Sequence, residues 1–339
     1  MFILLPSSAI FSTFLVLRTL IALSSSNWLM AWLSIEVNLL SFIPIILYRS
    51  KNQETEAAVK YFLAQALGSA LILYSRISIF TTGASNLAYA LLTLRLILKL
   101  GAAPCHFWFP SVIVSITWIN SLILCTWQKL GPLCLLIFTA VGHSNLKSLI
   151  FLCAIISALI GGLIGINQTH TRSIIAYSSI THIGWTLGAF YSDSPSASLI
   201  YFTAYTLIII PIFTIFAMWK LNRATQIHII INSVANLFIF GLLMLSLSGI
   251  PPLTGFIPKW FIVLLLSSYR PVLVITLIIG SLINLYFYLR LLFSIVVASI
   301  SHIHKPIPNK YNILPVTAAA ASSLLGLFPI IIYAMTLLY

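Results

Sequence analysis

The sequence predicts an all-α polytopic membrane protein with about eleven transmembrane helices, two of them discontinuous. Of the 339 residues, 60% are hydrophobic and only 6% are charged, which leaves too little polar surface to coat a soluble particle. The apolar residues fall into successive runs, each close to the roughly 20 residues that a helix needs to cross a bilayer. Two of these runs are interrupted by prolines and glycines beside a lysine, and isolated charges of this kind are rare within membranes.

The expected spans follow from these apolar runs. They lie at residues 3–23, 27–48, 57–80, 86–108, 115–141, 146–166, 172–191, 196–219, 227–268, 271–296 and 313–338. The first span lacks the basic segment and the cleavage site of a targeting peptide. No connection between spans exceeds about 20 residues, so residues 1–339 are expected to form a single transmembrane domain.

Loop charges predict the orientation of these spans. If residues 227–268 cross once, the N-terminal side carries seven loop cations, whereas the opposite side carries only Lys147 and Arg270. The seven are Arg49, Lys51, Arg172, Lys220, Arg223, Lys305 and Lys310. Two crossings in that run would leave six cations against three, so a single crossing obeys the positive-inside rule better. The N-terminus is therefore expected on the cytoplasm-equivalent side. The basic residues are scattered singly, so nucleic-acid binding is not implied.

The run at residues 227–268 is interrupted between Ser248 and Trp260. Three prolines and two glycines fall in this stretch. A continuous helix cannot form there, because each proline removes a backbone donor and clashes with the preceding turn. Lys259 stands at the break without an acid nearby in the sequence. A lone ammonium group within a membrane is costly unless it lines a polar cavity, so Lys259 is predicted to belong to an ion path.

Lys99 and Lys129 repeat this arrangement. Lys99 precedes the interruption Gly101–Pro104 in the fourth span, and Lys129 precedes Gly131–Pro132 in the fifth. The fourth span and the run at 227–268 lie about five spans apart, which suggests the two halves of an inverted-repeat transporter fold. Arg95 lies one turn from Lys99, where it either places a like charge beside the amine or reaches the lipid headgroups.

Glu36 is the only acid in the middle of a predicted span, and Asn38 accompanies it. A carboxylate in hydrocarbon is costly or takes up a proton, and an adjacent ammonium group can reverse that choice. A row of titratable groups is therefore predicted through the middle of the bilayer. Its members are Glu36, Lys99, Lys129 and Lys259. The alternative is a structural ion pair that only holds two helices together.

Other polar residues give weaker signals. His182 lies in a polar stretch of the seventh span and is either a proton relay, since its reference pKa of about 6.5 is near neutrality, or a hydrogen-bonded structural residue. Glu56 and Lys60 have the spacing of an ion pair on a helix surface. Arg290 either reaches the interface or lies on the ion path. The cysteines are expected to be packing residues without a metal site. They are Cys105, Cys125, Cys134 and Cys153.

Eight segments form a recognisable set. They are Trp32–Pro44, Thr55–Phe62, Lys99–Trp108, Thr126–Pro132, Asn167–Thr169, Ala176–Trp185, Gly249–Trp260 and Asn284–Leu291. Together they closely resemble the family of NADH-ubiquinone oxidoreductase chain 2, the antiporter-like membrane subunit of mitochondrial respiratory complex I. The resemblance covers residues 25–295, and the match from Pro251 to Trp260 is highly specific. The short chain is similar to the animal mitochondrial form, which lacks three N-terminal helices of its bacterial relatives.

This resemblance implies an antiporter-like inverted repeat that takes part in proton translocation coupled to electron transfer from NADH to ubiquinone. It implies that Glu36 and Lys99 are a coupled pair, that Lys129 is the central relay, and that Lys259 is the exit-side site. No flavin, iron–sulfur or dinucleotide motif is found in the sequence. The chain is therefore expected to bind no cofactor, with NADH, FMN, iron–sulfur clusters and ubiquinone served by other subunits.

The resemblance also implies partners and a location. The partners are other membrane-arm subunits of complex I and membrane lipids, cardiolipin among them. The location is the mitochondrial inner membrane, with the N-terminus on the matrix side and the C-terminus on the intermembrane side. Four residues depart from the family pattern: Ser111 where an acid is usual, Cys105 where Phe is usual, Ser173 where Lys is common, and Arg95. Two other classes stay open, a stand-alone sodium/proton antiporter and a scaffold subunit without its own proton path.

Overall fold

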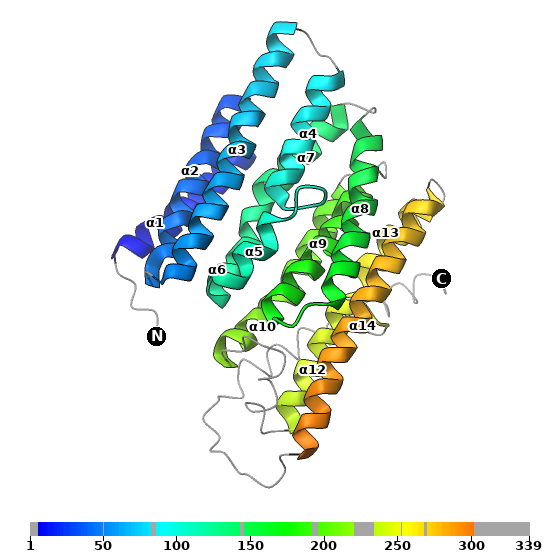
Figure 1. Cartoon of the computed structure of the whole chain (residues 1–339). Coiled ribbons are helices and arrows are strands. Elements are labelled where there is room, and N and C mark those ends of the chain that lie inside the picture. The colour runs from blue at the N-terminus through cyan, green and yellow to red at the C-terminus, as the bar shows by residue number, and fades with distance from the viewer. Residues whose placement is uncertain are drawn as a thin grey trace, which may run out of the picture. The chain divides into compact units, whose positions relative to one another are not determined.

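The computed structural model of the chain describes residues 6–49, 51–82, 86–142, 146–191, 196–219, 234–251, 253–267 and 270–301. Every regular element in these residues is a helix, as Figure 1 shows. The predicted all-α membrane class is therefore confirmed. The chain divides into two compact units, Met1–Cys153 and Ala154–Tyr339. A single transmembrane domain stays a prediction, and the expected span at 313–338 lies outside the described residues.

Six stretches of described helix are long and apolar enough to cross a membrane. They are Trp28–Ile46, Asn52–Thr81, Trp118–Ala140, Leu146–Ile166, Ser196–Trp219 and Pro271–Ser294. Most spans were placed well from the sequence, because a long apolar run has no other stable structure in lipid than a helix that satisfies its own backbone groups. The predicted spans at 146–166 and 196–219 coincide with helices at both ends.

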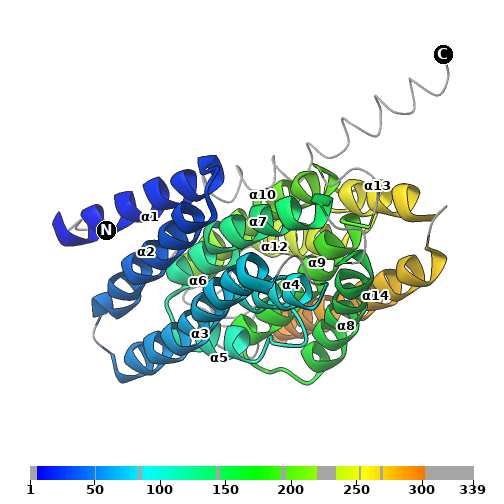
Figure 2. The same ribbon diagram turned by 90° about the horizontal axis from the view of Figure 1, so that it is seen from above.

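The first unit contains seven α-helices and the start of an eighth. They are α1 (Pro6–Ser24), α2 (Trp28–Ile46), α3 (Asn52–Thr82), α4 (Asn86–Leu100), α5 (Trp108–Ser115), α6 (Trp118–Cys125), α7 (Trp127–Gly142) and α8 (Leu146–Ile166), with a 3-10 turn at Leu47–Arg49. Helix α1 packs on α2 and α7, and α3 packs on α2, α4 and α5. In Figure 2, α2 lies between α1 and α3.

Two boundaries in the first unit differ from the sequence predictions. Helix α3 begins at Asn52 and not at residue 57, so Glu54 and Glu56 lie in its first turns. Acidic side chains are favourable in the first turn of a helix, because the N-terminal end of the helix dipole is positive. The fifth span is interrupted at Thr126 and not at Gly131–Pro132, which lie inside α7. A proline strains the turn that precedes it, and the break lies on that side of Pro132.

The second unit is built around α9 (Thr171–Ala189), which is buried along almost its whole length. The other helices are α10 (Ser196–Trp219), α12 (Val234–Ser248), α13 (Phe256–Ser267) and α14 (Pro271–Ser301), with the second part of α8. Helix α9 packs on α10, α13 and α14. Glycines let α8 approach closely: a Cβ atom on Gly161 would lie 2.6 Å from the Thr181 side chain, and one on Gly162 would lie 3.2 Å from Ile283.

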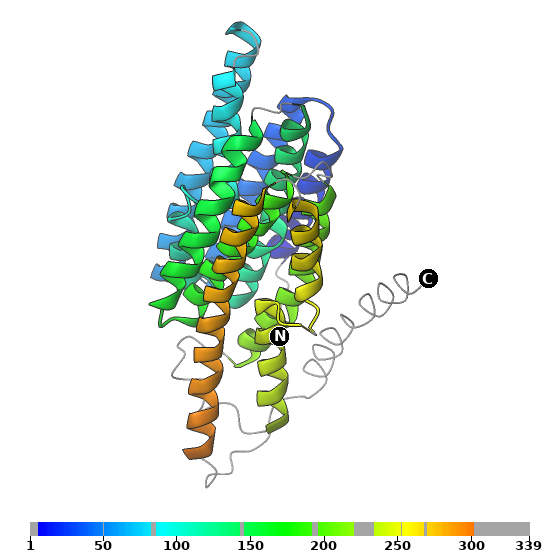
Figure 3. The ribbon, with the colours of Figure 1, turned by 90° about the vertical axis from the view of Figure 1, so that its right-hand side faces the viewer.

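The predicted interruption after Ser248 is confirmed, because α12 ends there and α13 begins at Phe256. Figure 3 shows α12 in yellow-green and α13 in yellow following one another in the same direction, with α14 in orange running back beside them. This arrangement favours the single broken crossing over two separate crossings. The part of the expected span between residues 227 and 233 lies outside the described residues.

We expect Gly161→Ala to destabilise the protein by about 1–3 kcal/mol, because the new methyl group would overlap Thr181 and the Tyr177 carbonyl in a close helix contact. Gly241→Ala is the matched control, since a Cβ atom there would meet only the Leu292 side chain at 3.6 Å. Thermal unfolding of the detergent-solubilised protein measures both. Equal melting temperatures for the two variants would contradict the close approach of α8 to α9.

Candidate functional site

Lys99 lies in the last turn of α4, and that helix ends at a glycine with left-handed backbone geometry. Gly101 has a φ of 71°, and its amide bonds to the carbonyl of Leu98 at 3.0 Å. The next amide, that of Ala102, bonds to the carbonyl of Ile97 at 3.2 Å. This is a Schellman ending, which glycine adopts without strain. Lys99 is thus at the C-terminal end of α4, where the helix dipole favours positive charge.

Side chains satisfy the carbonyl groups that the break releases. Gln65 of α3 donates from Nε2 to the carbonyl of Lys99 at 3.3 Å. Trp108, the first residue of α5, donates from Nε1 to the carbonyl of Leu98 at 3.0 Å. A buried helix end without such donors would be unstable, so these two bonds hold the break in place.

The amine of Lys99 is buried, and Nζ has no hydrogen-bond partner among the described residues. Gly68 of α3 leaves room for the side chain, because a Cβ atom there would lie 3.1 Å from Cγ of Lys99. Glu36 of α2 is the acid whose charge acts on Lys99, and its Oε2 atom is also buried without a hydrogen-bond partner in the described part of the chain. The two groups interact without direct contact, since the one ion pair seen among the described residues joins Lys60 and Glu56.

Lys129 is the third residue of α7, directly after the break at Thr126. Its side chain is buried, and Nζ lies 4.1 Å from the centre of the Phe109 ring of α5. This is cation–π geometry. Lys99 and Lys129 line the same cavity, whose volume of about 20 Å³ is enough for one water molecule. A bound water there would occupy a cavity that both lysines line.

An amide pair beside this cavity joins α2 to α7. Asn38 donates from Nδ2 to Oε1 of Gln128 at 3.0 Å, and Gln128 donates from Nε2 to Oδ1 of Asn38 at 3.4 Å. The hydroxyl of Tyr61 in α3 also donates to Oε1 of Gln128, at 3.4 Å. All three side chains line the cavity. Their hydrogen bonds to one another therefore hold this part of the cavity wall in place.

In the second unit, Lys259 lies in the first turn of α13, but its amine reaches back to the end of α12. Nζ donates to the carbonyl of Ser248, the last residue of α12, at 2.5 Å. Gly249 has a φ of 82°, and its amide and the next one bond to the carbonyls of Ser246 and Leu245 at 3.1 and 3.4 Å. Helix α12 therefore ends in the same Schellman geometry as α4, and a buried amine lies at its C-terminal end.

His182 lies on α9 and is hydrogen-bonded through Nδ1 to the hydroxyl of Tyr201 at 2.8 Å. Tyr201 is stacked on Trp185, one turn along α9, with the ring centres 6.1 Å apart. The Trp185 ring lies 5.9 Å from Nζ of Lys259. His182 and Lys259 thus belong to one buried group of side chains. Nearby on α9, Thr181 accepts a hydrogen bond from Nδ2 of Asn284 on α14.

The predicted row is therefore found as two groups, one in each unit: Glu36, Lys99 and Lys129 in the first, and Lys259 and His182 in the second. The three lysine side chains are all buried, with 3%, 2% and 7% of their surface exposed for Lys99, Lys129 and Lys259. Their role on an ion path stays a prediction.

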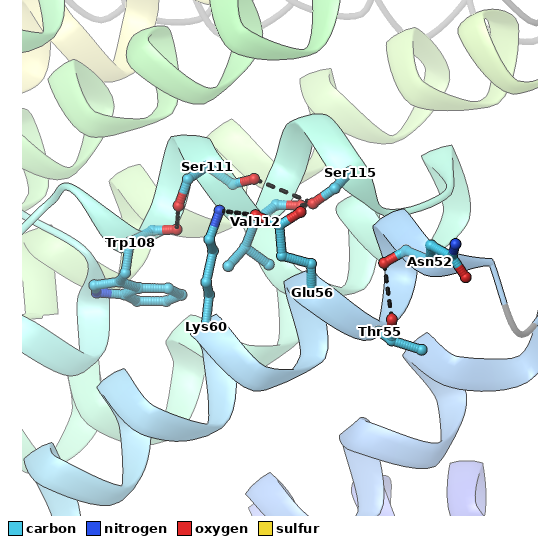
Figure 4. Close-up of polar contacts among 8 residues, drawn as sticks. All are labelled: Asn52, Thr55, Glu56, Lys60, Trp108, Ser111, Val112 and Ser115. Carbon is cyan, nitrogen blue, oxygen red and sulfur yellow. Dashed lines mark hydrogen bonds and ion pairs between the residues drawn. The ribbon is translucent and has the colours of Figure 1, made fainter.

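Three other polar positions are also resolved. Arg95 donates to the carbonyl of Leu71 and lies 5.7 Å from the Tyr74 ring, so its guanidinium group is bound to α3. Arg290 is exposed and donates to the carbonyl of Ile166 at 3.1 Å. The Glu56–Lys60 pair is an exposed ion pair of 2.5 Å, as predicted. Figure 4 shows it on α3 beside Ser111 and Ser115 of α5.

Arg18 is a cavity residue that the sequence reasoning missed. It lies on α1 and lines the cavity together with Lys99 and Lys129. The signal available in the sequence was an isolated arginine in the middle of the first predicted span, 3–23. Intramembrane arginines are as unusual as intramembrane lysines.

The chain matches known proteins along most of its length. The family described as NADH:quinone oxidoreductase/Mrp antiporter, TM, matches residues 25–284. Relatives named NADH-ubiquinone oxidoreductase chain 2 include that of Lumbricus terrestris, 45% identical over 85% of this chain and 87% of the relative. The one of Anopheles gambiae is 39% identical over 90% of this chain and 91% of the relative.

Two solved structures share the fold. A chain of respiratory complex I from Thermus thermophilus with bound aureothin aligns with a TM-score of 0.81 at 23% identity, over 95% of this chain and 78% of that chain. A chain of the Mrp complex from Dietzia sp. DQ12-45-1b aligns with a TM-score of 0.81 at 16% identity, over 95% of this chain and 75% of that chain. At these identities the likeness concerns the fold alone.

We expect Gly249→Ala to destabilise the protein by about 1–3 kcal/mol, since alanine is strained in left-handed geometry and its methyl group would crowd Nζ of Lys259, only 2.9 Å from the Cβ position. Gly131→Ala is the control, because Cβ there would meet only Ile35, at 4.0 Å. Thermal unfolding of the purified protein compares the two. A melting temperature unchanged by Gly249→Ala would contradict the position assigned to Lys259.

Proposed function

Because this chain belongs to the NADH-ubiquinone oxidoreductase chain 2 family, within the wider NADH:quinone oxidoreductase/Mrp antiporter group, we propose that it is a core membrane subunit of respiratory complex I. In this role it takes part in proton translocation coupled to electron transfer from NADH to ubiquinone. Its place is the mitochondrial inner membrane, as the animal relatives suggest. It acts as part of an enzyme whose redox chemistry takes place elsewhere.

The observation that supports this function best is the burial of three lysine amines beside helix breaks. A buried amine is stable only if it loses its proton or has a polar partner. Its proton affinity therefore depends on its surroundings, which is what a proton-carrying site needs. The fold common to complex I and the Mrp complex is consistent with such a path.

In the proposed mechanism, a change in the distance between Glu36 and Lys99 alters the free energy of protonating Lys99. The two groups already influence one another without an ion pair, so a movement that brings them into contact strengthens their interaction. A water in the shared cavity then carries the proton between Lys99 and Lys129. Lys259, with His182 nearby, is the exit-side site of the second unit.

The energies required are moderate. Moving one charge against roughly 150 mV costs about 3.5 kcal/mol. This corresponds to a change in proton affinity of a few hundredfold at one group. Bringing a carboxylate into contact with an ammonium group in a poorly solvated site supplies a change of that size.

We propose that the chain itself holds no redox cofactor. NADH, FMN, the iron–sulfur clusters and ubiquinone are served by other subunits of the complex. Its partners are those neighbouring subunits of the membrane arm and the surrounding lipids, including cardiolipin. The N-terminus faces the matrix and the C-terminus the intermembrane space, as the loop charges indicate.

We expect Glu36→Gln, Lys99→Met and Lys129→Met each to reduce the protons pumped per NADH severalfold in the assembled complex, because each removes one titratable group while conserving side-chain size. Lys60→Met is the control, since Lys60 forms only the exposed pair with Glu56. Proton uptake by inverted inner-membrane vesicles measures the ratio. Normal pumping and assembly in all variants would favour a scaffold role, and sodium-coupled transport by the isolated chain in vesicles would favour a stand-alone antiporter.

The orientation has its own test. We expect a cysteine at Lys51→Cys to react with a membrane-impermeant thiol reagent only from the matrix side, and one at Arg270→Cys only from the intermembrane side. Both positions are exposed and lie next to helix ends. Mitoplasts and inverted vesicles present the two sides, and the unmodified chain corrects for its native cysteines. The reverse pattern of labelling would show that the N-terminus faces the intermembrane space.

A further inference from the structure

The cavity between Lys99 and Lys129 has an unusual lining. Three of its side chains are cationic, Arg18, Lys99 and Lys129, and they come from α1, α4 and α7. Among the described residues that line this cavity none carries a carboxylate, and Glu36 is not one of them. Helix α1, which carries Arg18, packs on both α2 and α7.

Two amide oxygen atoms at the cavity wall already accept hydrogen bonds. Oε1 of Gln128 accepts hydrogen bonds from Asn38 and Tyr61, and Oδ1 of Asn38 accepts one from Gln128. A metal cation that leaves water needs several oxygen ligands in place of its hydration shell. This cavity offers neutral oxygen atoms beside three cationic side chains, together with space for a single water.

We propose that Arg18 is a specificity-determining residue, which keeps metal cations out of this cavity while a single water transfers hydrogen ions between Lys99 and Lys129. This inference rests on the proposed function. Lys99 and Lys129 must change their charge during transfer, so their repulsion of a cation is not constant. An arginine guanidinium stays protonated in proteins, so Arg18 supplies a permanent positive charge. A fixed arginine beside a narrow polar site raises an electrostatic barrier to every cation, protons included. The amines of Lys99 and Lys129 can still take up a proton because they bind it covalently, whereas a metal cation gains no such bond.

A second arginine of the same unit shows a different arrangement. The guanidinium of Arg76 lies 4.4 Å from the centre of the Trp28 ring, in cation–π geometry, and Arg76 does not line the cavity. Its contact holds α3 against α2. Arg76 is therefore a matched control for the loss of an intramembrane positive charge that has a packing role only.

The experiment measures NADH-driven uptake of radioactive sodium by proteoliposomes that contain the assembled complex, in parallel with proton pumping. The variants are Arg18→Glu, Arg18→Gln, Arg18→Lys and Arg76→Gln. We expect Arg18→Glu to raise sodium uptake on the order of tenfold, because it reverses a unit charge at the cavity, and Arg18→Gln to raise it less. Arg18→Lys and Arg76→Gln should behave like the unmodified complex, since the first keeps the charge and the second leaves the cavity unchanged.

Sodium uptake that is equal in all variants would overturn the proposal. So would a failure of both Arg18→Gln and Arg18→Glu to assemble while Arg18→Lys and Arg76→Gln assemble, because the charge would then serve folding. The Lys99→Met and Lys129→Met variants separate this inference from the proposed function. If they pump normally, the proton path itself is wrong; if they fail to pump and sodium uptake is indifferent to Arg18, only the role of Arg18 is wrong.

Discussion

The C-terminal end of an interrupted helix is the structural constraint on which both candidate sites depend. In α4 and in α12, a glycine with a positive φ closes the helix by Schellman hydrogen bonds, and a buried lysine amine lies at that end. A helix end within a membrane leaves carbonyl groups that need donors, and a buried amine needs a negative environment. At α12 the amine of Lys259 meets both needs by donating to the carbonyl of Ser248, whereas at α4 the carbonyls take other donors and the helix dipole alone favours the charge of Lys99.

The two sites use this arrangement differently. Lys99 has no hydrogen bond at Nζ, and the carbonyls around it are satisfied by Gln65 and Trp108 instead. Its partner is Glu36, which acts through space. Lys259 is bound directly to the carbonyl of Ser248. The first amine is thus controlled by a side chain that can itself change charge, whereas the second is held by a backbone dipole that cannot.

Features with a local cause could be predicted from the sequence, and those with a tertiary cause could not. Long apolar runs and proline–glycine clusters act on their own neighbours, so the helices and the interruption beside Lys259 were foreseen. The break in the fifth span was predicted at Gly131–Pro132 but lies at Thr126. A proline disturbs the turn before it, but it does not determine at which residue the helix ends. The Tyr201 partner of His182 and the cavity position of Arg18 depend on how separate helices pack, which spacing along one chain does not encode. Arg95 shows the same limit, since its acceptor lies on another helix.

The hydrogen-bond acceptor of Lys259 is a main-chain atom, and this affects which substitutions evolution can tolerate around it. Replacing Ser248 alters its hydroxyl group but leaves the carbonyl that binds the amine. This contact therefore constrains the identity of Lys259 and of Gly249, but not the side chain of the residue that supplies the oxygen. The acceptor in this contact depends on the backbone conformation and not on a side chain. Comparing side-chain identities among relatives will therefore not reveal it.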